Sequence, residues 1–454
     1  MSAPADGLAA LSAAFSGTIL TAEDAGYDHA RRVHNGLIDK HPSVIARCLN
    51  TADIVDAVNY GRDEGLEISV KGGGHNPAGS AVTDGGLMID LSLMKGIHVD
   101  PSAKTARAQG GVNWNEFNRA TALHGLAVTG GAVSSTGIAG LTLGGGLGWV
   151  MSSYGMAVDN VRSIELITAD GQVLTASDDE NSDLFWACRG GGGNFGVAAS
   201  FEYNLHTLSM VTGGLIAHPL SAAGDVIRFY REFTQDVGDD LTVFCGLVHA
   251  PDGSGTKLAA FVVCHVGDPA KADRDLAPLK SFGEPAMVAV GVMPYPVVNT
   301  LLDDGFPQGA LNYWKSAFLS GLSDVFIDTA IERFATCPSP MTGMLVEHFH
   351  GEVTRVEPTA TAFPHRERSY NLLIAGEWID PAESEENTLW VKDTYEALAP
   401  HFSGRRYVNY LGDDEASDAV RSSYGVVYDR LLDVKRRYDP DNLFHLNQNI
   451  DPGS

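Results

Sequence analysis

Three glycines followed by a histidine most restrict how this chain can fold. The run covers residues 71–79, Lys-Gly-Gly-Gly-His-Asn-Pro-Ala-Gly. Residues 66–70 before it alternate as in a strand, and residues 51–64 predict a helix with Thr51 at its N-cap and Gly65 just past its end. Glycine backbone can approach a flat polar molecule closely, and its N–H groups can face phosphate or ring oxygens. His75 beside such a loop is well placed to be a ligand, a base or a covalent attachment point, and a glycine-rich turn with a solvated histidine is the alternative.

A second glycine cluster spans residues 132–149, Ala-Val-Ser-Ser-Thr-Gly-Ile-Ala-Gly-Leu-Thr-Leu-Gly-Gly-Gly-Leu-Gly-Trp. It is too apolar for a solvated linker, so its buried N–H groups need partners, and a pyrophosphate is a natural one. A packing turn between a strand and a helix is the alternative. A third cluster contains Gly-x-Gly-x-x-Gly at Gly191, Gly193 and Gly196. A helix is expected before it and a strand after it, at 197–205, which is the reverse of the Rossmann arrangement.

Length and charge limit the classes of function. The 454 residues suffice for two domains, and the formal net charge of −26 argues against nucleic acid and anionic membranes as partners. The N-terminal residues show no signal peptide, and no run of 18 apolar residues occurs. The five cysteines are widely spaced in apolar settings, as in a cytoplasmic protein with reduced thiols. We therefore expect a cytoplasmic location. The sequence carries no signal for oligomeric state.

The pattern of predicted strands, helices and motifs changes twice along the chain. Residues 1–208, with a core at about 38–208, predict a β–α–β lobe followed by a second lobe. Residues 209–404 alternate short strands with helices and contain few motifs. Residues 405–454 hold a helix at 424–438 and a polar, amide-rich closing segment.

Together, the glycine clusters and the closing segment resemble the FAD-linked oxidases with a vanillyl-alcohol-oxidase (PCMH-type) flavin domain, in the berberine-bridge-enzyme-like branch. The resemblance covers nearly the whole chain. It implies an α+β fold: a two-lobed FAD-binding domain plus a substrate domain with an antiparallel sheet backed by helices. It also implies FAD held covalently by His75 through the 8α-methyl group. The expected cofactor-binding residues are Lys71, Gly72, Gly73, Gly74, His75, Asn76, Gly79, Val133, Ser134, Thr136, Gly137, Gly140, Leu141, Gly144, Gly145, Gly146, Gly148, Trp149, Asn160, Gly196, Val197, Tyr410, Asn447 and Asn449.

The resemblance also assigns roles near the reacting atoms. Val133 aligns with a cysteine that forms a second flavin link in many relatives, so a single histidyl link is expected. Thr136 aligns with the residue that governs dioxygen access. Tyr410 aligns with a tyrosine that takes part in substrate deprotonation. Asn371 aligns with an acid of some relatives, and an amide there can orient substrate but cannot be a base.

Residues 345–350 predict a strand on which Glu347 points one way and His348 and His350 the other. One of these faces is a candidate pocket lining, whereas a metal site is not expected because no third ligand has suitable spacing. Core packing is the expected role of the aromatic residues Tyr295, Tyr313 and Trp314, with the pocket wall as the alternative.

The leading expectation is an FAD-dependent oxidase. It would take hydride from a small organic alcohol, amine or activated C–H and pass the electrons to dioxygen. A natural-product tailoring enzyme working through an oxygenated flavin is a second hypothesis, which only Thr136 supports locally. A flavoprotein that binds a ligand without turnover is a third, against which His75 and Tyr410 argue.

Overall fold

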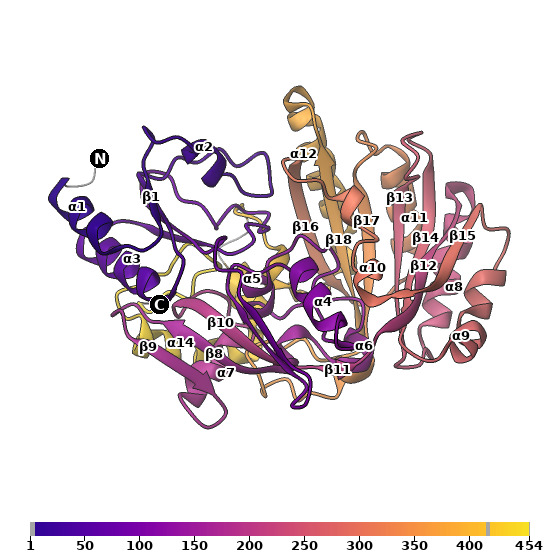
Figure 1. Cartoon of the computed structure of the whole chain (residues 1–454). Helices are drawn as coiled ribbons and strands as arrows, with labels where there is room; N and C mark the ends of the chain where they lie inside the picture. Colours follow the sequence, from indigo (N-terminus) through magenta and orange to yellow (C-terminus); the bar gives the residue numbers. More distant parts are fainter. Residues whose placement is uncertain (1–4, 415–417, 454) are drawn as a thin grey trace.

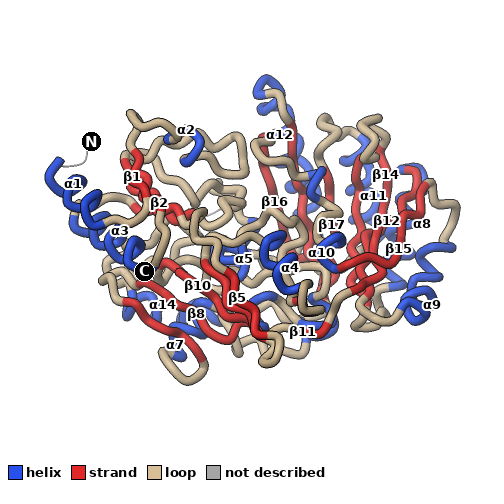
Figure 2. The backbone as a smooth tube through the Cα atoms, viewed as in Figure 1, coloured by secondary structure: helices blue, strands red, loops and turns tan. Residues whose placement is uncertain are grey.

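The computed structural model describes residues 5–414 and 418–453, and in this part of the chain the strands form four-, five-, two- and seven-stranded sheets. The chain has two halves side by side (Figure 1). One half holds the smaller sheets, and the other is built on the seven-stranded sheet, called the large sheet below. Long loops run between the two halves (Figure 2).

The four-stranded sheet has the order β1-β2-β4-β3, with β1 antiparallel to β2 and the other neighbours parallel. The elements are α1 (Ala5–Ala14), β1 (Thr18–Leu20), α2 (Tyr27–Ala30), β2 (Val44–Arg47), α3 (Thr51–Asp63), β3 (Ile68–Lys71) and β4 (Leu87–Asp90). The expected helix and strand before the glycine loop are thus present. The N-cap is Asn50 rather than Thr51, because the Asn50 side chain accepts a hydrogen bond from the Asp53 N–H at 3.0 Å.

The five-stranded sheet is antiparallel, in the order β5-β6-β10-β8-β9. Its strands are β5 (Ile97–Asp100), β6 (Thr105–Gln109), β8 (Val161–Ile167), β9 (Val173–Ser177) and β10 (Val197–Asn204). Around it lie α4 (Trp114–Ala122), β7 (Leu126–Ala127), α5 (Ile138–Leu143), α6 (Met151–Tyr154), η1 (Ala157–Asn160), α7 (Ser182–Cys188) and β11 (His206–Thr207). Helix α4 begins with a capping box between Asn113 and Glu116.

The large sheet is antiparallel throughout, in the order β15-β12-β14-β13-β17-β18-β16. Its strands are β12 (Met210–Pro219), β13 (Leu241–His249), β14 (Lys257–His265), β15 (Met287–Pro294), β16 (Leu311–Leu319), β17 (Gly343–Phe349) and β18 (Ser369–Trp378). Helices α8 (Ala223–Phe233), α9 (Pro269–Ser281), α11 (Asp324–Ala335) and α12 (Ser384–Leu398) contribute to one core cluster with it. They back the face that points away from the first half (Figure 1).

The other face of the large sheet packs on the first half. Phe244, Phe318 and Phe349 of this face share a core cluster with Trp149 and Tyr407. A smaller cluster joins Trp314, Leu345 and Leu373 to Tyr410. The interface between the halves is therefore an apolar core, except where the cavity described below interrupts it.

The C-terminal segment returns to the first half, as the sequence predicts. Phe444 and Ile450 belong to core clusters of that half. The buried Lys435 ammonium donates to the carbonyls of Asn194 and Phe444 at 2.9 Å and pairs with Asp439. The helix expected at 424–438 is shorter. Gly425, with a φ of 47°, breaks the helix, so α14 runs over Tyr428–Tyr438 only. The elements before α14 in this segment are η7 (Val408–Tyr410), α13 (Ala419–Tyr424) and η8 (Gly425–Val427).

Among the described residues, no helix has the length and apolar content needed to cross a bilayer.

Candidate active site

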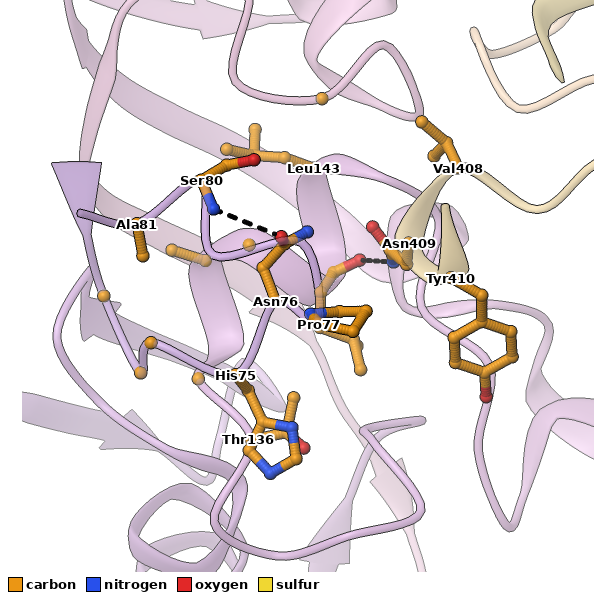
Figure 3. Close-up of a pocket in the computed structure, with 18 of the residues that line it drawn as sticks. His75, Asn76, Pro77, Ser80, Ala81, Thr136, Leu143, Val408, Asn409 and Tyr410 are labelled. Atoms are coloured by element: carbon orange, nitrogen blue, oxygen red, sulfur yellow. Dashed lines mark hydrogen bonds between the residues drawn. The ribbon is translucent and has the colours of Figure 1, made fainter. Parts of the chain in front are cut away.

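A cavity of about 220 Å³ opens between the two halves and gathers segments distant in the sequence. Its floor comes from the loop around His75, the loop around Thr136 and the third glycine cluster. Its roof comes from the inner face of the large sheet, and one side comes from residues 407–410 and 447–448. Figure 3 shows His75 next to Thr136, with Tyr410 reaching in from the C-terminal segment.

Two glycine loops meet backbone to backbone below the cavity. A methyl group added to Gly73 would collide with the backbone of Gly137, and one added to Gly137 would collide with Gly73. Gly74 has a φ of 67°, which favours glycine, and turns the chain so that the next residue, His75, lines the cavity. These glycines are therefore needed to bring the His75 loop and the Thr136 loop to one site.

His75 is half-buried and stacks on the ring of His34, with ring centroids 3.7 Å apart and planes 18° from parallel. Its Nε2 lies 3.2 Å from the Ser135 hydroxyl. Burial, with a further contribution from His34, lowers the pKa of His75 to about 3. The imidazole is therefore uncharged at neutral pH and has a lone pair available, as a nucleophile requires.

The loop of residues 133–137 presents small side chains to the cavity. Val133 and Thr136 line it, whereas Ser134 turns away and donates from its N–H and hydroxyl to the Asp303 carboxylate, at 2.8 and 2.6 Å. Asp303 belongs to the second half of the chain, so this contact ties the loop to that half.

A buried carboxyl group faces the cavity from the large sheet. Glu347 of β17 accepts hydrogen bonds from the Tyr410 hydroxyl at 2.9 Å and from the Asn371 amide at 2.8 Å, one on each oxygen. Burial raises the pKa of Glu347 to about 7, although both hydrogen bonds act in the opposite direction. Burial, together with the charge of Glu347, also raises the pKa of Tyr410. At neutral pH, Glu347 is therefore a better proton acceptor than Tyr410.

The rest of the roof is apolar. Phe244, Trp314, Leu345 and Leu373 line the cavity from neighbouring strands of the large sheet, and Leu302 and Phe306 close its rim. Glu347 is the single charged residue among the described residues that line the cavity. A molecule in this part of the cavity therefore meets hydrocarbon on most sides and one acid–base group.

The expected cofactor residues divide into two groups. Those that line the cavity are Gly72, Gly73, Gly74, His75, Asn76, Val133, Thr136, Gly137, Gly140, Leu141, Gly196, Tyr410 and Asn447. Those that lie behind the lining are Lys71, Gly79, Ser134, Gly144, Gly145, Gly146, Gly148, Trp149, Asn160, Val197 and Asn449.

The second group supports the walls. Lys71 donates to the Ala30 carbonyl at 2.7 Å, and Asn160 donates to the carbonyls of Tyr154 and Met156. Gly144 lies against the Asn409 amide, which donates to the Leu141 carbonyl at 3.0 Å. Asn371 also lies behind the lining, with its amide nitrogen donating to a Glu347 oxygen.

The cavity suits a flavin dinucleotide. The described residues that line it include no Lys or Arg, so phosphates would have to be held by backbone N–H groups, which the clustered glycines leave accessible. A methyl group added to Gly140 would meet no protein atom within 4 Å.

Sequence reasoning left Glu347 out of the expected site, although the alternation of β17 pointed to it. His348 and His350 stack on each other on the opposite face, and His348 also stacks on Tyr370. Trp314 lines the cavity, whereas Tyr295 is buried in a core cluster. Phe244, Leu345 and Leu373 were not identified, because isolated apolar residues in strands carry no signal of their own.

Comparisons with known proteins agree with this geometry. The family described as "FAD binding domain" matches residues 42–177, and the one described as "Berberine and berberine like" matches residues 406–451. The chain is 33% identical to the (R)-6-hydroxynicotine oxidase of Paenarthrobacter nicotinovorans, over 96% of this chain and 97% of that protein.

Solved structures show the same fold. The 6-hydroxy-D-nicotine oxidase from Arthrobacter nicotinovorans superposes with a TM-score of 0.88 at 32% identity, covering 96% of this chain and 98% of that one. BBE-like 1 of Physcomitrella patens superposes with a TM-score of 0.87 at 22% identity, covering 96% and 97%. The family and the α+β fold expected from the sequence are confirmed. The chain therefore belongs to the berberine-like FAD-linked oxidoreductases and is an FAD-dependent oxidase.

Proposed function

We propose that this protein oxidises a small, largely apolar organic molecule carrying one alcohol or amine, with FAD attached covalently to His75 and with dioxygen as the electron acceptor. The observation that carries the proposal is Glu347, held by Tyr410 and Asn371 at the apolar roof of the cavity. The 33% identity to (R)-6-hydroxynicotine oxidase supports an oxidase acting on a small organic substrate.

Glu347 is the proposed proton acceptor. Its carboxylate would take the proton of the substrate O–H or N–H as the adjacent carbon loses a hydride. Tyr410 and Asn371 each donate to a different oxygen, so the carboxylate is held in one orientation. When bound, FAD supplies the acceptor for the two electrons. The proposed role of Tyr410 is to position Glu347 and to stabilise its charged form.

The apolar roof favours substrates with few polar groups. A sugar would bring several hydroxyls against Phe244, Leu345 and Leu373, whose side chains offer no hydrogen-bond partner. Each buried unpaired polar group costs about 1–3 kcal/mol. An aromatic or aliphatic alcohol or amine buries its hydrocarbon part there and offers its single polar group to Glu347.

Covalent attachment at His75 is supported by the uncharged imidazole at the cavity wall. Val133 lines the cavity at the position aligned with the second link of relatives, and its hydrocarbon side chain has no nucleophilic atom. Both observations support the proposal of a single attachment through His75.

The remaining parts of the proposal concern organisation. Residues 1–208 and 405–454 are proposed to form the cofactor domain and 209–404 the substrate domain, supported by the core cluster that joins residues 106–205 to residues 408–450. A cytoplasmic location is supported by five cysteines that are all buried free thiols.

The test is anaerobic mixing of the oxidised protein with apolar alcohols and amines. The rate at which flavin absorbance is lost at about 450 nm measures flavin reduction. Bleaching by these compounds, followed by recovery of colour when air is admitted, is the expected result. Ligand-induced spectral changes without bleaching across such a set would instead favour a protein that binds without turnover.

A further inference from the structure

His34 stacks on His75 and is held by contacts to both halves of the chain. The residue is 2% exposed, and its backbone N–H donates to the Gly74 carbonyl at 2.8 Å. Its carbonyl accepts from the Gly309 N–H at 2.9 Å, and its Nδ1 lies 3.3 Å from the Gln308 side-chain oxygen. Gln308 is fixed in turn by donating to the Val33 carbonyl at 2.9 Å. The ring under His75 is therefore rigid.

Two contacts together restrict the His75 ring. Stacking on His34 fixes the plane of the imidazole, at 18° from parallel and 3.7 Å between centroids. The Ser135 hydroxyl, 3.2 Å from Nε2, fixes the rotation of the ring within that plane. Stacking and hydrogen bonding thus act on different degrees of freedom, and neither alone would hold the ring.

Simple space filling does not account for His34. Its Nε2 is buried and has no hydrogen-bond partner within the described protein. An unpaired buried polar atom is destabilising, so an aliphatic side chain of similar size would be more favourable for packing alone. Stacking on His75 requires a flat ring, and burial, which lowers the pKa of His34, keeps this ring uncharged.

We propose that His34 and Ser135 are positioning residues that present the His75 imidazole in one orientation for formation of its covalent bond to FAD. The inference rests on the covalent link of the proposed function. The Ser135 hydroxyl contacts Nε2 and acts only on the orientation of the ring.

The step balances with dioxygen as the oxidant. A C–N bond forms between a ring nitrogen of His75 and the 8α carbon of FAD. One imidazole N–H and one 8α C–H bond are given up, and both protons leave. The two electrons pass into the flavin and from there to dioxygen, which is released as hydrogen peroxide. His34 takes no part in these bond changes, and its effect is on the orientation of the nucleophile.

The experiment separates binding of FAD from its covalent attachment. The full chain is produced under riboflavin limitation and then mixed with FAD in air. Total bound flavin is read from absorbance, and covalent flavin from the fraction that stays with acid-precipitated protein over time. The variants are His34→Ala, His34→Phe, Ser135→Ala and Ser135→Thr. His41→Ala serves as the control, since His41 is an exposed histidine outside the cavity.

His34→Ala is expected to slow covalent attachment at least about tenfold at equal FAD occupancy, because misplacing a reacting group by about 1 Å can cost about a hundredfold. His34→Phe keeps a flat ring and is expected to stay within about threefold of the wild type. Ser135→Ala should be slower than the wild type, and Ser135→Thr should restore the rate by restoring the hydroxyl. His41→Ala should match the wild type.

Attachment by His34→Ala at the wild-type rate would overturn the role of His34, and the same result for Ser135→Ala would overturn that of Ser135. If His34→Ala fails to fold, His34→Phe and the two Ser135 variants decide, since a tenfold loss in His34→Phe would contradict positioning by stacking. A wild-type protein with no covalent flavin would refute the His75 link itself, and this outcome is visible before any variant is made.

Discussion

Replacing Glu347 with glutamine should slow anaerobic flavin reduction by substrate about a hundredfold or more at pH 8, because a positioned base contributes about 10²–10⁴-fold. The substitution keeps the volume. Tyr410 can still donate to the new amide oxygen. Asn371 can rotate its amide so that its Oδ1, which has no partner in the wild type, accepts from the new N–H. The variant therefore removes the base with little disturbance of its surroundings.

The pH dependence of the same reaction gives a second measurement. Burial raises the pKa of Glu347 to about 7, so about one carboxyl group in ten is ionised at pH 6. The reduction rate of the wild type should rise about tenfold between pH 6 and a plateau above pH 8. The glutamine variant should lack this rise, because an amide does not titrate. Stopped-flow absorbance at saturating substrate measures both profiles.

Stability gives a third measurement that needs no substrate. The folded-state pKa lies above the ordinary value of 4.5, so the folded protein binds this proton more tightly than the unfolded chain. This contribution to stability is complete below pH 4.5 and is lost as the pH rises through about 7. Relative to the wild type, Glu347→Gln should gain up to about 3 kcal/mol between pH 5 and pH 8 in denaturant unfolding. Wild-type reduction rates in the variant, or parallel stability profiles, would refute the reasoning.

Three further outcomes are expected. His75→Ala should release all its flavin on acid precipitation, and any flavin that stays with the protein would reveal an attachment other than the one assigned. Tyr410→Phe should move the midpoint of the pH profile above that of the wild type and slow reduction at pH 7 at least about tenfold, because it removes a hydrogen bond that lowers the pKa of Glu347; an unchanged profile would limit Tyr410 to packing. Thr136→Leu should slow reoxidation by dioxygen while Thr136→Val does not, as stopped-flow mixing with oxygenated buffer would show, and equal rates in all three proteins would remove Thr136 from oxygen access.

The glycine clusters made much of the cofactor half predictable. Backbone that must approach a ligand or another backbone closely excludes side chains, and this constraint is visible in sequence as glycine. Gly73 and Gly137 illustrate it, since neither tolerates a Cβ against the other. The hydrophobic periodicity of α3 and β3 also predicted the helix and strand that lead into the His75 loop.

The substrate side of the site could not be predicted in the same way. Glu347, Trp314 and Leu373 come from three neighbouring strands, and their convergence depends on the strand order β17-β18-β16, which local patterns do not encode. The role of Glu347 depends on burial and on hydrogen bonds from residues 24 and 63 positions away in the chain. The N-cap of α3 was misassigned by one residue, because Asn50 and Thr51 are both good capping residues and only geometry distinguishes them.

The return of the C-terminal segment has a consequence for how the protein matures in the cell. Tyr410, Asn447 and Gln448 line the cavity, yet the ribosome adds them after every other part of its wall. At about 5–20 residues per second, the glycine loops around His75 emerge tens of seconds before these residues do. A nascent chain without these residues therefore lacks part of the cavity wall, and the wall is complete only after residue 448 has been added. Chains that stop short of residue 405 would carry the His75 loop but would lack the side of the cavity that residues 407–410 and 447–448 form.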